Sequence, residues 1–106
     1  MATPAFDLDP PERHIIHTVG PVWDGGAYGE AEILASCYRR SLEVADSLGV
    51  QSIAFPAIAT GRYGYPAGQA ARIAIEAIRS THTNVDLIRL VAFDGETYEL
   101  LGAAAA

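Results

Sequence analysis

The sequence predicts an α/β fold, with a mostly parallel sheet covered by helices, in one domain of 106 residues. Strand-like and helix-like segments alternate along the chain, an order that favours right-handed βαβ units. A short and nearly continuous apolar run at residues 51–58 suits a strand that is buried on both faces. No internal repeat or low-complexity linker divides the sequence, so we expect a single domain.

The first elements are an irregular lead-in, a strand and a long helix. Residues 1–12 carry three of the six prolines, which is typical of irregular structure. The segment HIIHTVG, residues 14–20, indicates a strand that ends before Pro21. From Glu30 to Leu48 apolar residues recur at helical spacing, and Gly49 directly after them marks a helix end.

The remaining elements follow the same alternation. Residues 51–58 form the next strand, and Pro66 opens a second helix because proline is favoured at the first helical position. Residues 85–93 form a third strand, and Glu96 to about Ala103 a short last helix. The expected order is therefore βαβαβα over residues 13–102, followed by a tail at 103–106.

Composition excludes several classes of function. Thirteen acidic against seven basic residues give a net charge of −6 without a Lys/Arg cluster, so we expect no nucleic-acid partner. The single Cys37 lies on the apolar side of a helical pattern, which favours a buried thiol over a nucleophile. No metal-ligand spacing occurs, and we expect neither metal nor cofactor. Without a signal peptide or a span of about 20 apolar residues, we expect a cytoplasmic protein that does not bind membranes.

The most informative stretch is PAIATGRYGYP, residues 56–66. It joins a strand to a helix at the carboxyl end of the sheet, where α/β proteins bind ligands. Gly61 and Gly64 permit close approach of the backbone, and the next helix presents unpaired N–H groups, so phosphate is the natural ligand. An ordinary βα turn is the alternative. Tyr63 and Tyr65 either cover a sugar or base or cap the core.

Other polar and aromatic residues point less strongly to a site. His17 is expected to be a strand-end or core histidine, with a catalytic role as the alternative, and His14 and His82 are expected to be surface residues. Trp23 is either a wedge under the loops or part of a pocket wall. Asp94 is most simply a cap for the last helix. No triad and no recurring carboxylate pair occurs, so no catalytic residue is assigned.

A family resemblance rests on three stretches: HIIHTVGPVWDGG, LASCYRRSLEVADSLGVQSIAFPAIATGRYGYP and LVAFDGETYELL. Together they resemble the C-terminal part of a macrodomain, closest to the branch of mono-ADP-ribosyl and O-acetyl-ADP-ribose hydrolases. The resemblance runs from about Thr3 to Leu101. It implies a three-layer α/β/α fold, with a mostly parallel or mixed sheet and helices on both faces, of which about three strands and three helices are present.

The resemblance also implies a ligand, ADP-ribose or an ADP-ribosylated molecule. The segment that begins at Ala59 wraps the diphosphate, Tyr63 covers the distal ribose, and Phe93 lies against adenine. Ala59 stands where serine is usual, which removes one hydroxyl donor. The implied ligand-binding residues are Ala59, Thr60, Gly61, Arg62, Tyr63, Gly64 and Phe93.

The sequence lacks three segments of a complete macrodomain: the "GDI"-type strand, the "NAAN" segment and the "GGGVDGAI" loop. The hydrolase branch draws its catalytic Asp and Asn from the last two, so we expect a truncated domain whose strand Ser52–Ile58 has a bare edge. Three interpretations follow. The chain is an ADP-ribose-binding remnant without independent hydrolase activity, an ADP-ribosyl hydrolase or deacetylase completed by a second chain, or a non-binding fragment that self-associates through the exposed edge.

Overall fold

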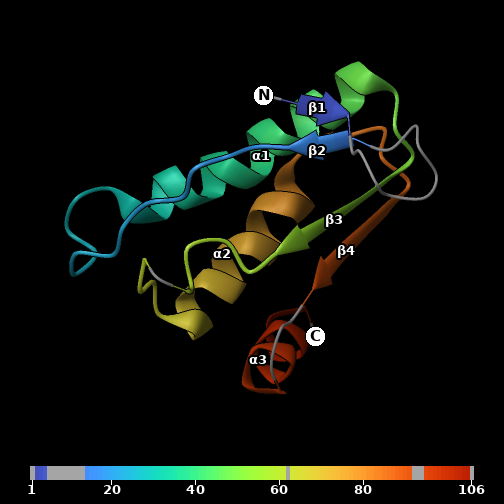
Figure 1. Cartoon of the computed structure of the whole chain (residues 1–106). Helices are drawn as coiled ribbons and strands as arrows, with labels where there is room; N and C mark the ends of the chain where they lie inside the picture. Colours follow the sequence, from blue (N-terminus) through green and yellow to red (C-terminus); the bar gives the residue numbers. More distant parts are fainter. Residues whose placement is uncertain (1, 5–13, 62, 92–94, 106) are drawn as a thin grey trace.

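The computed structural model describes residues 2–4, 14–61, 63–91 and 95–105 (Figure 1). Strands and helices alternate from the second strand onward, which confirms the α/β class. The elements are β1 (Ala2–Pro4), β2 (His14–Ile16), α1 (Glu30–Leu48), β3 (Ser52–Pro56), α2 (Ala67–Ser80), β4 (Leu87–Val91) and α3 (Gly95–Ala105). Each helix that the sequence predicts is present.

Helix α1 has the bounds that its apolar spacing predicts. Its C-terminus is closed by Gly49, which has φ 69° and so adopts the left-handed conformation that glycine tolerates best. The Gly49 N–H donates to the Asp46 carbonyl at 3.1 Å, and the Val50 N–H donates to the Ala45 carbonyl at 3.3 Å. This pair of hydrogen bonds is the Schellman motif, which pairs helix carbonyls that would otherwise lack partners.

The strands form two separate pairs. β3 runs parallel to β4, with Ser52 opposite Leu87 and Pro56 opposite Val91, whereas β1 and β2 pair antiparallel. The lead-in expected over residues 1–12 is therefore wrong for residues 2–4, which form β1. Main-chain pairing with β2 is enough to form a strand of this length, and proline is compatible with an edge strand. The proline content of this segment was therefore not a reliable sign of irregular structure at residues 2–4.

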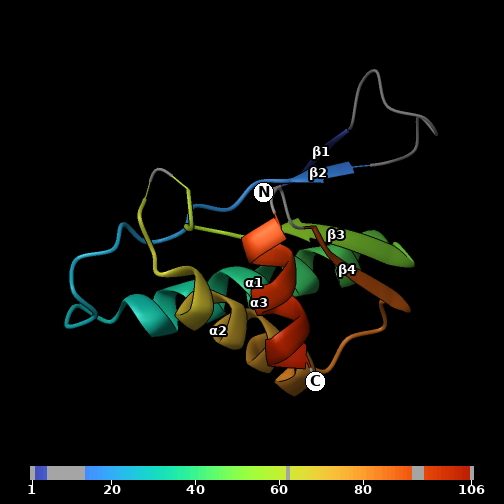
Figure 2. The same ribbon diagram turned by 90° about the horizontal axis from the view of Figure 1, so that it is seen from below.

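The core lies between β3 and the helices α1 and α2, on one side of the β3–β4 pair (Figure 2). Phe55 of β3 is buried, and its ring lies 5.0 Å from that of Tyr38 on α1. The alternate strand residues Ala54 and Pro56 are exposed. The prediction that the strand at 51–58 is buried on both faces is therefore wrong, because an apolar run does not reveal how many of its faces are covered. The buried hydrophobic core comprises Leu34, Cys37, Tyr38, Leu42, Ala45, Phe55, Tyr65, Ala70, Ala71, Ala74, Ala77 and Val85.

Helix α3 packs alongside α2 rather than over the open face of the sheet. Leu100 of α3 lies against Gly68 of α2, and the Arg79 guanidinium donates to the Ala105 carbonyl. Helices α1 and α2 pack against each other on the core side of β3, and α3 lies next to α2 (Figure 2). Within the described ranges, no helix has the length and hydrophobicity that crossing a membrane requires.

Candidate functional site

The candidate site is the loop at residues 57–66, which joins β3 to α2. It leaves the carboxyl end of a strand in a parallel pair, the position at which α/β proteins bind ligands. Main-chain hydrogen bonds fold the loop onto itself. These N–H to carbonyl bonds join Thr60 to Ala57 at 3.3 Å, Gly64 to Gly61 at 3.1 Å and Tyr65 to Ala59 at 2.9 Å.

Ala59 has an unusual backbone conformation. Its φ is 67°, and it is the only non-glycine residue with positive φ among the described residues. The left-handed region costs an L-residue about 1–2 kcal/mol. Strain of this kind persists only where the surrounding structure enforces it, and it occurs often at ligand-binding sites. The turn at Ala59 is therefore held in place by its neighbours.

The loop leaves main-chain donors available. The N–H groups of Ala59, Gly61 and Tyr63 donate to no other residue in the described part of the chain. Successive N–H groups in a tight turn create a concave surface that attracts anions. The Thr60 hydroxyl, in contrast, is directed back into the loop, where it donates to the Ala57 carbonyl at 2.8 Å.

The aromatic residues Trp23 and Tyr65 support the loop from beneath. Tyr65 is buried, and its ring lies 4.8 Å from that of Trp23 at an angle of 54°. The Trp23 N–H donates to the Tyr63 carbonyl at 2.8 Å. Tyr65 therefore caps the core. Of the two roles that the sequence suggested for Trp23, the structure shows the first, a residue that packs beneath the loops. Tyr63 remains 37% exposed.

Glu30 organises the neighbouring loop at residues 24–29. Its carboxylate is buried with only 2% of the residue exposed, and it accepts hydrogen bonds from the N–H groups of Asp24, Gly26 and Tyr28 at 2.9, 2.9 and 2.7 Å. These hydrogen bonds lower the pKa of Glu30, and the bond from the Asp24 N–H has the largest effect. Burial of the carboxylate acts in the opposite direction. Burial, and then the nearby Glu30 charge, raise the pKa of Tyr65. The two loops are thus linked electrostatically as well as by packing.

Tyr38 holds the end of β3. Its hydroxyl donates to the Pro56 carbonyl at 3.4 Å and accepts from the Ile58 N–H at 3.3 Å. Only 2% of Tyr38 is exposed, and this burial raises the pKa of its hydroxyl to about 12, with the Ile58 N–H opposing the shift. The hydroxyl is therefore protonated at neutral pH, and it fixes the start of the candidate site.

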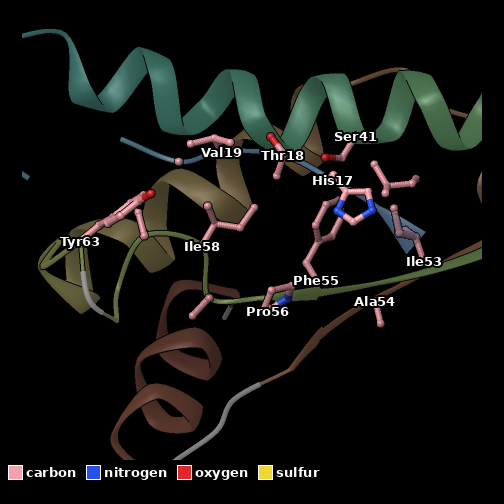
Figure 3. Close-up of a pocket in the computed structure, with 14 residues that line it drawn as sticks. His17, Thr18, Val19, Ser41, Ile53, Ala54, Phe55, Pro56, Ile58 and Tyr63 are labelled. Atoms are coloured by element: carbon pink, nitrogen blue, oxygen red, sulfur yellow. The ribbon is translucent and has the colours of Figure 1, made fainter. Parts of the chain in front are cut away.

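A pocket of about 450 Å³ opens beside the loop (Figure 3). One wall is the segment 16–20, the other is 53–59, and Ser41 of α1 also lines the pocket. Tyr63 stands at the loop end of the pocket, and His17 extends into it from the end of β2 (Figure 3). At Gly20 the walls meet, because a Cβ there would lie 2.8 Å from Ile58 Cγ2.

The structure brings five of the predicted ligand-binding residues together in this one loop: Ala59, Thr60, Gly61, Tyr63 and Gly64. Arg62, Phe93 and Asp94 lie outside the described residues. Cys37 is buried as predicted, with its thiol 3.4 Å from the Val19 carbonyl, and His82 is exposed as predicted.

Sequence reasoning missed the roles of Glu30, Tyr38 and Gly20. From the sequence, Glu30 was interpreted only as marking the start of a helix. Its position directly after a glycine-rich loop is nevertheless typical of a carboxylate that accepts hydrogen bonds from loop N–H groups. Tyr38 showed only the helical spacing of a core residue. The close approach at Gly20 carried no local signal beyond the Gly-Pro pair.

The fold and the loop together define a class: an α/β protein whose glycine-bearing βα loop borders a pocket at the carboxyl end of its sheet. The family model that matches the chain is the Macro domain, over residues 1–74. The chain therefore belongs to the macro domain family.

Relatives and solved structures agree with this assignment. A macro domain-containing protein of Streptomyces coelicolor is 52% identical over 103 residues, which are 97% of this chain and 59% of that protein. The Oceanobacillus iheyensis macrodomain with ADP superposes with a TM-score of 0.90 at 40% identity, covering 98% of this chain and 55% of that one. The Trypanosoma brucei macrodomain in complex with ADP-ribose has a TM-score of 0.77 at 31% identity, covering 91% and 41%. The chain thus spans between two fifths and three fifths of these proteins.

Proposed function

We propose that the loop at residues 57–64 binds the diphosphate of ADP-ribose, free or attached to another molecule. The observation that carries this proposal is the set of main-chain donors at Ala59, Gly61 and Tyr63, which have no partner among the described residues. Main-chain N–H groups bind phosphate without a basic side chain, which suits a chain of net charge −6. Macrodomain structures that superpose on this chain contain ADP or ADP-ribose, which supports the choice of ligand.

Side chains of the loop and its surroundings complete the proposed site. Tyr63 is partly exposed at the end of the pocket, where its ring can cover the distal ribose. Ala59 contributes its N–H but, unlike serine, offers no hydroxyl. Arg62 and Phe93 are proposed ligand contacts on the family resemblance alone.

We further propose that this chain belongs to the lineage of the ADP-ribosyl and O-acetyl-ADP-ribose hydrolases and that it binds without hydrolysing. Hydrolysis requires a group that positions or activates water. Among the residues that line the described pocket, none carries a carboxylate, the group that the family resemblance implies for this step, and the one imidazole among them is that of His17. The second candidate is a hydrolase completed by another polypeptide. It is favoured by the extent of the pocket, which continues from the loop into the space between 16–20 and β3 (Figure 3).

The test is calorimetric titration of ADP-ribose into the purified chain and into its Gly61→Glu variant. A Cβ at Gly61 meets no atom within 4 Å, so the substitution adds charge without a clash in the described structure. Two unit charges about 5 Å apart repel by about 3 kcal/mol at an effective dielectric constant of about 20, which weakens affinity about a hundredfold. Gly102→Glu is the matched control, because Gly102 is also unobstructed but lies on α3.

Binding by the wild type and Gly102→Glu, with loss in Gly61→Glu, would support the proposed site. Equal affinities for all three proteins would reject it. In parallel, incubation with an ADP-ribosylated protein tests hydrolysis, and we expect no release of ADP-ribose above the rate without protein. Turnover by the isolated chain would contradict the proposal that it only binds.

A further inference from the structure

The loop at residues 24–29 is folded around a carboxylate of its own chain. The N–H groups of Asp24 and Gly26 donate to Glu30 Oε2, both at 2.9 Å, and the Tyr28 N–H donates to Oε1 at 2.7 Å. Three glycines of this segment have φ between 75° and 89°, which curls the main chain so that these N–H groups converge. A concave turn of this kind binds anions, and here the buried Glu30 carboxylate is the anion. The shape of the loop therefore depends on the charge of Glu30.

The hydrogen bonds of Glu30 are not those of an ordinary residue at a helix start. An acidic side chain in the first turn commonly acts on the N–H groups and the dipole of its own helix. The three N–H groups from which Glu30 accepts all precede α1 instead. Glu32 differs, because it is exposed in the same first turn and pairs with Arg39. Glu30 therefore acts on the loop before the helix.

The main chain of this loop packs against the indole of Trp23. A Cβ at Gly26 would lie 2.9 Å from Cη2 and 3.6 Å from Cζ3 of that ring. The neighbouring Gly25 has a similar φ, 81° against 89°, but a Cβ there would meet no atom within 4 Å. The Gly26 N–H is also one of the three that donate to Glu30. Glu30 thus fixes the part of the main chain that lies against the indole.

Trp23 joins this loop to the candidate ligand site. Its main-chain N–H donates to the Tyr63 carbonyl at 2.8 Å, and its ring lies 4.8 Å from that of Tyr65. These two tyrosines flank Gly64 in the loop that carries the proposed diphosphate donors. In both views the loop before α1 and the loop before α2 lie at the same end of the molecule (Figures 1 and 2). A displacement of Trp23 would therefore remove a main-chain hydrogen bond and a ring contact from residues 63–65.

We infer that Glu30 is a positioning residue for ADP-ribose binding, which acts through Trp23 although Glu30 does not line the pocket. The inference rests on the proposed function of the loop at residues 57–64. Its carboxylate holds the loop at 24–29 in one shape, and that loop holds Trp23 beneath Tyr63 and Tyr65. A ligand that needs one arrangement of its binding loop binds more weakly when that arrangement is populated for only part of the time. Affinity should therefore depend on the charge of Glu30.

The first test is calorimetric titration of ADP-ribose into the wild type, Glu30→Gln and Gly49→Ala, well below the Tm of each protein. The glutamine amide offers one oxygen, and its NH2 group is a donor, so at most two of the three loop N–H groups keep an acceptor. We expect Glu30→Gln to bind about tenfold or more weakly, which corresponds to a binding loop that is correctly arranged for about a tenth of the time.

Gly49→Ala is the control for a loss of stability alone. It strains the other end of the same helix, where φ is 69° and a Cβ would meet no atom within 4 Å. Its Tm should fall, whereas its affinity for ADP-ribose should stay within about twofold of the wild type, as is usual for a change far from the site.

A second pair of variants changes no charge. Alanine at Gly25 and at Gly26 meets the same backbone strain, because both positions have positive φ, but only the Cβ at Gly26 meets Trp23. We expect Gly26→Ala to bind ADP-ribose about fivefold or more weakly than Gly25→Ala, since only the former displaces the indole. This comparison remains informative if Glu30→Gln does not fold.

Hydrogen exchange of the Trp23 amide measures the same link without ligand. This N–H donates to the Tyr63 carbonyl, so its exchange reports whether the two loops stay joined. We expect it to exchange about tenfold or more faster in Glu30→Gln than in the wild type, and at nearly the wild-type rate in Gly49→Ala. A role of Glu30 confined to helix stability would not produce this difference between the two variants.

The outcomes separate this inference from the proposed function. Equal affinities of the wild type and Glu30→Gln would overturn the inference and leave the ligand site intact. So would an equal loss in Gly49→Ala, equal affinities of Gly25→Ala and Gly26→Ala, or unchanged exchange of the Trp23 amide in Glu30→Gln. Absence of ADP-ribose binding by the wild type would instead reject the proposed function, and the role of Glu30 with it.

Discussion

Removing the Tyr38 hydroxyl tests how firmly the end of β3 is held. Tyr38→Phe preserves the ring, and with it the packing against Phe55 at 5.0 Å, and deletes only the two hydrogen bonds to Pro56 and Ile58. A net hydrogen bond contributes about 0.5–1.5 kcal/mol. At 3.4 and 3.3 Å both bonds are long, so we expect a loss of about 1–2 kcal/mol. In a domain of this size that lowers Tm by about 5–15 °C.

The same substitution should also change how the free energy of unfolding depends on pH in alkaline solution. Burial raises the pKa of Tyr38 from 10.0 to about 12, so the protonated hydroxyl is the form that the fold favours. The stabilisation associated with this shift is complete below pH 10, where both folded and unfolded chains are protonated, and is lost as the pH rises toward 12. Over that interval the wild type should lose about 2–3 kcal/mol that the variant does not. The wild type should therefore lose its advantage over Tyr38→Phe in the free energy of unfolding as the pH rises, and near pH 12 the variant should become the more stable protein.

Urea unfolding followed by circular dichroism between pH 7 and pH 12 measures both effects. Tyr98→Phe is the matched control, because Tyr98 is 74% exposed on α3. It should leave the free energy of unfolding unchanged at pH 7. If Tyr38→Phe equals the wild type at pH 7 and follows the same alkaline profile, the hydroxyl does not hold the end of β3.

Three further substitutions probe the loops. Gly20→Ala should lower the free energy of unfolding by about 1–3 kcal/mol, because its Cβ would lie 2.8 Å from Ile58 Cγ2. The control Gly102→Ala should stabilise α3, since a Cβ there meets no atom within 4 Å. Equal melting temperatures for the two variants would contradict the close approach at Gly20. Glu30→Gln should lower Tm at pH 7, where the carboxylate accepts three N–H groups. Because the pKa of Glu30 is lowered from 4.5, this stabilisation is present above pH 4.5 and is lost as the pH falls through the folded value. The difference in Tm between Glu30→Gln and the wild type should therefore become smaller in acid. Glu43 is exposed on the same helix, so Glu43→Gln is the control and should show no such dependence on pH. Ala59→Gly should raise thermal stability slightly, since relief of about 1–2 kcal/mol of strain at φ 67° exceeds the entropic cost of glycine of about 0.4–1 kcal/mol; a lower Tm would show that Ala59 is not strained.

The elements that local pattern determines were predictable from the sequence. The bounds of α1 were correct because its apolar spacing and the terminal Gly49 both act within a few residues. The location of the loop between β3 and α2 was also predictable, since glycine, proline and the change of hydrophobic period mark it. The short strand β1 was not, because its pairing with β2 depends on residues far along the chain rather than on its own composition.

The supporting contacts of the candidate site were beyond prediction for the same reason. The Tyr38 hydroxyl meets Ile58, 20 residues away, and Trp23 meets Tyr63 across a helix and a strand. Helical spacing shows that Tyr38 faces a core, but it does not show which main-chain groups the hydroxyl reaches. Likewise, the apolar run at 51–58 did not reveal that only one face of β3 is covered.

The packing of Trp23 behind the loop has a practical consequence for spectroscopy. The sequence contains one tryptophan, so the whole indole emission of the protein comes from this position. The ring lies beside Tyr65, and its own main-chain N–H is bonded to Tyr63, which stands at the mouth of the pocket. Any movement of the loop changes the surroundings of that indole. The protein thus carries a built-in optical reporter, and occupancy of the loop can be followed in solution without attaching a label.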